Sequence, residues 1–229
     1  MPDLQVISAC TRRAGLLSQY EEQLAAADIP FHLESFDSMP NFERGSLGLR
    51  IAITRKMAEK FKHCAKLVFT DAWDMLFYGT AEEVFSKIPE DWPLLAAERN
   101  CWPDGYLAAY IKTTGTWRFV NGGASAGTPE SILKWCDAVE RHPAYHPGYI
   151  DQQWLNHRLL DGSMPMVIDV ETNLFYCMVM EAGELNCKLG KPVNTITGKN
   201  PNFIHFNSRT DPTLFLWRWA VSAGKLKGD

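Results

Sequence analysis

The sequence has no long hydrophobic run and no excess of positive charge. None of its 229 residues belongs to an apolar stretch that approaches the roughly 18–20 residues of a membrane span. The formal net charge of −4 provides no general attraction to a phosphate backbone, so a nucleic-acid-binding role has little support. The apolar fraction of 46% is enough for a substantial core, and we therefore expect a folded protein without a membrane span.

The N-terminus lacks the order of charges that a secretory signal has. Asp3 precedes the first apolar run, and Arg12 and Arg13 follow it, so we predict a first β-strand instead. The cysteines form no CxxC pair and no zinc-site spacing, which favours mostly reduced thiols and a cytoplasmic location. The six cysteines are Cys10, Cys64, Cys101, Cys136, Cys177 and Cys187.

The chain also lacks internal repeats, low-complexity tracts and an obvious linker. Its length is long for one domain and short for two. We therefore expect a single domain over residues 1–229.

Strand-like and helix-like segments alternate through the first two-thirds of the sequence. This order predicts an α/β fold with a mostly parallel central sheet. The predicted strands are residues 4–9, 31–36, 66–70, 92–98, 166–170 and 202–206, and the predicted helices are residues 13–28, 46–64, 80–88 and 151–160. Residues 101–117 are typical of an irregular loop. The segment "RFVNGGASAGTPESILKWCDAVE" predicts a strand, a glycine-rich turn, and a helix capped at Thr128.

Two carboxylates follow the most apolar strand. In "LVFTDAWDMLF", Asp71 and Asp74 come where the predicted buried strand ends. Ligands of open α/β sheets bind outside the carboxyl ends of the strands, and carboxylate oxygens suit Mg²⁺ or Mn²⁺. The alternative is structural, with Asp71 capping a turn and Asp74 solvated.

Other polar groups are expected at the same edge of the sheet. Trp73 lies between the two acids, where an exposed indole suggests a ring that stacks on a ligand. Asn121 precedes Gly122 and Gly123, where a ligand could approach the backbone closely. His205 ends a late strand, and its imidazole suits Mn²⁺ as a third ligand, although a core histidine is the plain alternative.

Five motifs in order resemble the glycosyltransferase domain of the procollagen lysyl hydroxylase family. They are "LVFTDAWDMLF", "AAERNCWPD", "FVNGGASAG", "DQQW" and "IHFN", and the resemblance runs from about residue 46 to residue 207. It implies a GT-A fold, which is a Rossmann-like fold that binds nucleotide sugars. It also implies Mn²⁺ (or Mg²⁺) and transfer of a hexose from UDP-glucose or UDP-galactose to an unidentified glycan or protein acceptor.

The resemblance also implies a role for each matching residue. The metal ligands would be Asp71, Asp74 and His205. Trp73 would contact the base, and Arg50 and Asn207 would lie beside the diphosphate. The sugar pocket and the acceptor side would be formed by Asn121, Gly122, Gly123, Trp102, Asp151 and Gln152. Where the family has a lysine that helps to bind the diphosphate, this chain has Gly48.

Two other functions remain open on the sequence. The same carboxylates could serve another metal-dependent nucleotide chemistry, although there is no GxxxxGK[ST] loop and no second acidic cluster for a two-metal site. The chain could instead bind nucleotide sugars without turnover.

The reaction's stereochemistry also remains open. Asp151 is the first candidate for contacting the acceptor or the developing positive charge on the sugar. Glu98 and Asp104 are weaker candidates, for which solvated loop acids are the alternative. An N-cap is the structural alternative for Asp151.

Overall fold

A computed structural model describes residues 3–10, 13–35, 46–178, 184–207 and 210–225 of the chain. Arg12 and the last residue of the predicted strand 31–36 lie outside these ranges. Among the described residues, no helix is long and apolar enough to cross a membrane.

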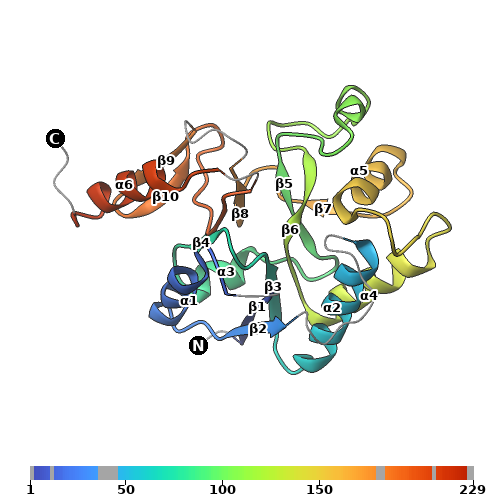
Figure 1. Cartoon of the computed structure of the whole chain (residues 1–229), viewed down its shortest axis with the longest axis horizontal. Helices are drawn as coiled ribbons and strands as arrows, with labels where there is room; N and C mark the ends of the chain where they lie inside the picture. The colour runs from blue at the N-terminus through green and yellow to red at the C-terminus, as the bar shows by residue number, and fades with distance from the viewer. Residues whose placement is uncertain (1–2, 11–12, 36–45, 179–183, 208–209, 226–229) are drawn as a thin grey trace.

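A six-stranded sheet forms the centre of the molecule (Figure 1). Its strand order is β2-β1-β3-β6-β5-β7, and β6 alone runs opposite to the other five. The prediction of an α/β fold with a mostly parallel sheet is therefore confirmed. The strands are β1 (Leu4–Cys10), β2 (Phe31–Ser35), β3 (Lys66–Thr70), β5 (Leu94–Glu98), β6 (Phe119–Gly127) and β7 (Val167–Ile168).

Helices cover both faces of this sheet, because successive side chains of a strand point to opposite faces. Val68 packs in the core beneath α1 (Leu17–Ala26) and α3 (Ala81–Lys87). Leu67 and Phe69 pack in a second core with the remaining covering helices. Those helices are α2 (Leu47–Lys60), α4 (Pro129–Arg141) and α5 (Asp151–Asp161).

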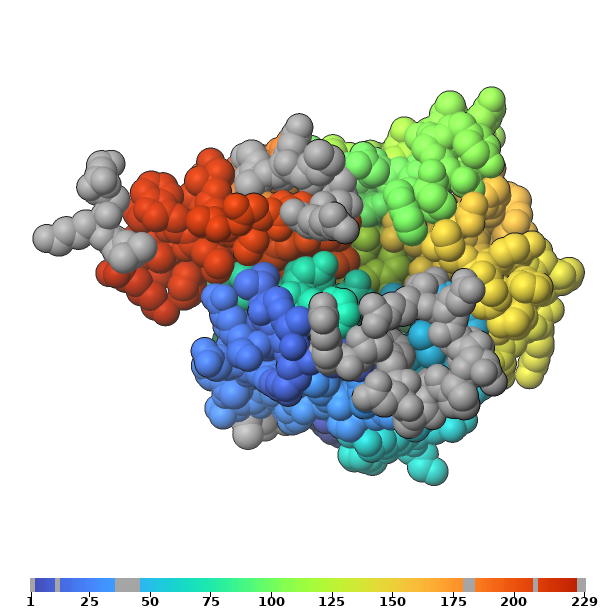
Figure 2. Space-filling model, viewed as in Figure 1, coloured from blue at the N-terminus to red at the C-terminus, as the bar shows by residue number. Residues whose placement is uncertain are grey.

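Smaller elements lie beside the central sheet. A three-stranded sheet has the order β4-β11-β8, with bounds Met75–Phe77, Phe203–His205 and Phe175–Cys177. The hairpin of β9 (Leu185–Lys188) and β10 (Lys191–Asn194) packs against α6 (Thr213–Ser222). Figure 2 shows α6, in red, in a lobe that projects from one side of the body.

Local sequence signals set the helix starts. Ser46, Thr80 and Thr128 each accept a hydrogen bond from the backbone N–H three residues later, as N-cap residues do. The first helix is shorter than predicted and begins at Leu17 instead of residue 13. The predicted loop 101–117 includes a short 3₁₀ helix, η2 (Gly105–Ala109).

The sequence prediction was wrong about the glycine-rich segment. Gly122 and Gly123 do not form a turn, because β6 continues through them from Phe119 to Gly127. Ala124 pairs with Thr70, the last residue of β3, and Phe119 pairs with Glu98, the last residue of β5. Since β6 is reversed, its first half lies where its two neighbours end.

Candidate active site

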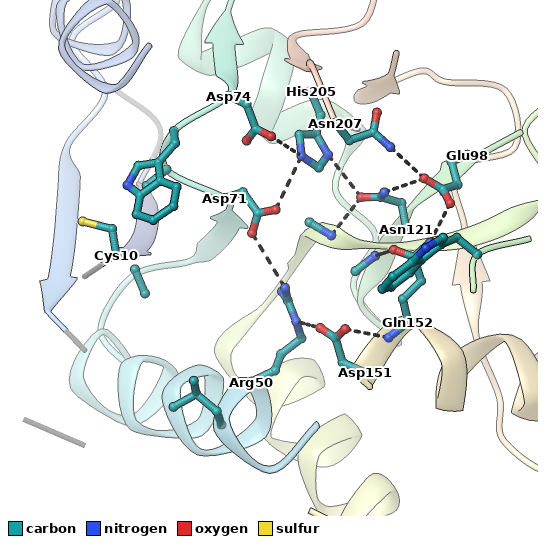
Figure 3. A pocket seen from close by; sticks show the side chains of 17 residues that line it. Cys10, Arg50, Asp71, Asp74, Glu98, Asn121, Asp151, Gln152, His205 and Asn207 are labelled. Atoms are coloured by element: carbon teal, nitrogen blue, oxygen red, sulfur yellow. Dashed lines mark hydrogen bonds and ion pairs between the residues drawn. The ribbon is translucent and has the colours of Figure 1, made fainter. Parts of the chain in front are cut away.

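A cavity of about 490 Å³ opens at the carboxyl ends of β1, β3 and β5 (Figure 3). Its size is within the range of small-molecule sites, which is about 300–1,000 Å³. All twelve site residues predicted from the sequence line it: Arg50, Asp71, Trp73, Asp74, Trp102, Asn121, Gly122, Gly123, Asp151, Gln152, His205 and Asn207. The central sheet, the small sheet and two helix N-termini therefore contribute to one site.

Two carboxylates and one imidazole converge in this cavity. Asp71 directly follows β3, Asp74 directly precedes β4, and His205 ends β11, which pairs with β4. His205 Nε2 lies 3.4 Å from Asp71 Oδ2 and 3.4 Å from Asp74 Oδ2. One ligand atom from each residue lies within 4.8 Å of the others, which is compact enough for the three to share a single ion.

The other ring nitrogen of His205 faces the protein interior. His205 is 3% exposed, and its Nδ1 lies 3.2 Å from Asn121 Oδ1 and 3.8 Å from Cys177 Sγ. Burial alone would lower the pKa of His205, but interactions with Asp74 and Cys177 outweigh burial and raise that pKa. The imidazole therefore has acidic groups on one side and a neutral amide on the other.

Glu98 is a buried acid at the end of β5. Its Oε1 accepts a hydrogen bond from Gln152 (2.6 Å), and its Oε2 accepts one each from Asn121 and Asn207 (2.8 Å). Burial raises the pKa of Glu98, while these hydrogen bonds act in the opposite direction. At 3% exposure Glu98 is not a solvated loop acid, so that alternative was wrong.

Asp104 lies outside this cavity. Its carboxylate accepts hydrogen bonds from Gln153 (2.9 Å) and from His157 (2.8 Å), both on α5. Asp104 is not among the residues that line the cavity. Its contacts indicate a role in holding the 3₁₀ segment against α5.

Arg50 connects the acids of two different elements. Its Nε donates to Asp151 Oδ2, and its Nη2 lies 3.7 Å from Asp71 Oδ1. Asp151 is the first residue of α5 rather than its N-cap, which is Ile150, so the capping alternative is not supported. The Asp151 carboxylate instead holds the guanidinium beside the proposed metal ligands.

The glycines of β6 make room for the site. A Cβ on Gly123 would lie 2.3 Å from His205 Cε1 and 2.8 Å from Asp71 Oδ2. A Cβ on Gly122 would lie 3.0 Å from an Asp151 oxygen. The backbone of β6 can therefore pass close to these side chains only where a side chain is absent.

Two tryptophans lie at the rim of the cavity. Trp73 is half-buried and packs against the cluster of Cys10, Leu17 and Ala72. Trp102 is 53% exposed and follows β5. Both indoles line the cavity, so each can contact a bound ligand.

Two residues that position the site were not among the twelve predicted from the sequence. Glu98 was only a weak candidate, although its place after four buried apolar residues parallels that of Asp71 after β3. Asn156 is the second of these residues. It pairs with both backbone groups of Val120 and so fixes α5 to β6. No local sequence signal identifies it.

Comparisons with known proteins place these features in a family. The family model described as the PLOD GT domain matches residues 36–216, most of the chain. A multifunctional procollagen lysine hydroxylase and glycosyltransferase of Caenorhabditis elegans is 29% identical over 230 residues, which is 90% of this chain. A procollagen-lysine,2-oxoglutarate 5-dioxygenase of Drosophila melanogaster is 26% identical over 168 residues, 69% of this chain. The chain spans only 30% and 22% of the lengths of these two relatives.

A solved structure has the same fold. It is a glycosyltransferase involved in the glycosylation of the major capsid of PBCV-1, with a TM-score of 0.54 and 13% identity. The match covers 90% of this chain and 94% of that one. The family model, the relatives and the fold agree, and the chain belongs to the family of PLOD glycosyltransferase domains.

Proposed function

We propose that the chain is a metal-dependent glycosyltransferase that moves glucose or galactose from a UDP-sugar to a glycan or protein acceptor. The observation that carries the proposal is the cluster of Asp71, Asp74 and His205, whose ligand atoms converge inside a cavity of ligand size. Two carboxylate oxygens and one imidazole nitrogen are a donor set that suits Mn²⁺. The residues present therefore fit the ion that the family implies.

The rest of the cavity supports the binding of a UDP-sugar. Trp73 offers an aromatic face beside two of the ligands, where a uracil ring would stack. Arg50 offers guanidinium donors to a diphosphate held by the same ion. Asn207, whose NH₂ group donates to Glu98, lines the cavity beside that space. Asn121, the two glycines beside it and Trp102 border the space that remains for the sugar.

When bound, a divalent ion supplies a Lewis acid that stabilises the negative charge growing on a departing diphosphate, typically worth several kcal/mol. The protein's contribution is to hold the side chains around the ion in position. Asp151 orients Arg50 toward the diphosphate side, and Gln152 lies next to it on the first turn of α5. We place both residues nearest the transferred sugar and the acceptor, where the Asp151 carboxylate would face positive charge developing on the sugar.

A screen of donor sugars tests this function. The purified protein is incubated with UDP-glucose, UDP-galactose and other UDP-sugars, and UDP release is followed with Mn²⁺ and with a chelator. We expect slow, Mn²⁺-dependent UDP release from one of the two hexose donors. Asp74→Asn should abolish it, whereas Asp91→Asn, an exposed acid just before β5, should not.

Two results would argue against the proposal. UDP release that is indifferent to the chelator would remove the metal's role. Tight Mn²⁺-dependent UDP binding without release from any donor would favour a non-catalytic binding protein instead.

A further inference from the structure

The orientations of two buried amides are fixed by backbone N–H groups, which can only donate. Gly123 N–H donates to Asn121 Oδ1 at 2.8 Å, and Gly122 N–H donates to Gln152 Oε1 at 3.0 Å. Side-chain amide oxygen and nitrogen are otherwise assigned from their surroundings. Here the oxygen of each amide must face the backbone of β6, and its NH₂ group must therefore point away from that backbone.

Both NH₂ groups point at Glu98. Asn121 Nδ2 and Gln152 Nε2 donate to different oxygens of this carboxylate, and Asn207 adds a third donor. Within the described residues, Glu98 therefore acts only as an acceptor, which is what an ionised carboxylate does. Asn121 is held at both ends, by the Gly123 N–H and by Glu98.

The fixed orientation of Asn121 determines which nitrogen of His205 carries hydrogen. Asn121 Oδ1 lies 3.2 Å from His205 Nδ1, and an amide oxygen can only accept. Nδ1 must therefore be the N–H donor, which leaves the lone pair of a neutral imidazole on Nε2. Nε2 is the atom that faces Asp71 and Asp74 (Figure 3).

We infer that Asn121, anchored by Glu98, is a positioning residue that holds His205 as the Nδ1–H tautomer, with Nε2 free to bind a divalent ion. The inference rests on the proposed metal site and gives Asn121 a role different from contact with the sugar. Histidine ligands commonly donate their second N–H to such a partner, and its loss typically lowers metal affinity about 10- to 100-fold.

Cys177 is the competing partner for the same nitrogen. Its Sγ lies 3.8 Å from His205 Nδ1, at the far end of the range for sulfur, and a thiol is a weak acceptor. Asn121 is closer and carries a stronger acceptor. If Asn121 holds the tautomer, removing the thiol should matter little.

The test measures Mn²⁺ affinity from the electron paramagnetic resonance signal of the free ion. Asn121→Leu keeps a similar volume and removes the acceptor, so the affinity should fall about 10- to 100-fold. Cys177→Ala should bind within about threefold of the parent, since the amide still accepts the Nδ1 proton.

A double variant separates the hydrogen-bond role from a packing role. E98Q/N121D moves the carboxylate from position 98 to position 121, where its oxygens can still accept from Gly123, from His205 and from the NH₂ group of the new glutamine. That NH₂ group takes the place of the Glu98 oxygen to which Asn207 donates, so Asn207 turns its Oδ1 toward it and accepts its second N–H. We expect Mn²⁺ affinity within about threefold of the parent. If Asn121 only filled space, the double variant would have no reason to bind Mn²⁺ more tightly than Asn121→Leu.

The parent protein provides a direct spectroscopic readout that does not depend on a variant's folding. With Zn²⁺ bound, ¹⁵N spectra of the coordinated histidine should show a protonated Nδ1 and a metal-bound Nε2.

Three results would overturn the inference while leaving the metal site in place. They are binding through Nδ1, unchanged Mn²⁺ affinity in Asn121→Leu, and a double variant as weak as that single variant. If the parent bound no Mn²⁺ at all, the proposed function itself would fall, and this inference with it.

Discussion

Trp73 shows how one side chain can serve both the core and a ligand. One part of the residue packs against the cluster of Cys10, Leu17 and Ala72, and the half-buried ring also lines the cavity. Its position between Asp71 and Asp74 places it beside the proposed metal site, and therefore beside the nucleotide that the proposed ion would bind. Stacking of a base on an aromatic ring is worth about 1–3 kcal/mol.

We therefore expect Trp73→Ala to weaken UDP binding in the presence of Mn²⁺ by about 5- to 150-fold, because the stacking surface is lost. Trp73→Tyr retains an aromatic face and should cost little. Isothermal titration calorimetry with UDP measures both. Equal losses in the two variants would instead assign Trp73 a packing role.

At the residue scale, the sequence predicted which residues line the cavity better than it predicted which residues hold them in position. Asp71 and Asp74 could be placed because a continuous apolar strand ends just before them and points to a sheet edge. Glu98 and Asp104 looked equivalent in the sequence, yet one is buried among three amides and the other pairs with α5 outside the cavity. That difference depends on partners that are distant in sequence, which no local pattern reveals.

At the scale of the element, β6 contributes most to the shape of the site. It is an antiparallel strand between β3 and β5, and two of its glycines line the cavity. Its glycines suggested a turn because glycine usually weakens a strand. They are tolerated here because the strand is paired on both sides and because His205, Asp71 and Asp151 occupy the space of the missing side chains. The sequence pattern alone cannot distinguish a glycine-rich turn from a glycine-containing strand. The difference here depends on side chains from other elements that pack against the strand.

Gly123→Ala tests this account of β6. The added methyl would collide with the His205 ring and with Asp71, so Mn²⁺ affinity should fall on the order of tenfold or more, as when a ligand's support is lost. Overpacking should also lower the free energy of unfolding by about 1–3 kcal/mol. Mn²⁺ titration and chemical denaturation measure the two effects.

Gly105→Ala in η2 is the matched control, because nothing lies within 4 Å of its added methyl. It should leave Mn²⁺ affinity unchanged. If Gly123→Ala bound Mn²⁺ as well as this control does, β6 would not be the wall of the metal site.

At the scale of the whole molecule, the α/β class followed from the order of strands and helices alone. The three-stranded sheet did not, because β4, β8 and β11 are three-residue segments that pair across long stretches of chain. That small sheet carries His205 to the edge of the large one. The site therefore depends on the packing of the two sheets, and a reading of separate segments could predict its residues without predicting how they meet.

The central claim is that Asp71, Asp74 and His205 hold one divalent ion that binds a UDP-sugar. Crystals grown with Mn²⁺ and UDP, and measured for anomalous scattering of manganese, test it most directly. The account predicts one strong manganese peak bonded to both carboxylates and to His205 Nε2, with UDP phosphate oxygens completing its coordination. A manganese peak elsewhere, or UDP bound in the cavity with no metal among these three residues, would contradict it.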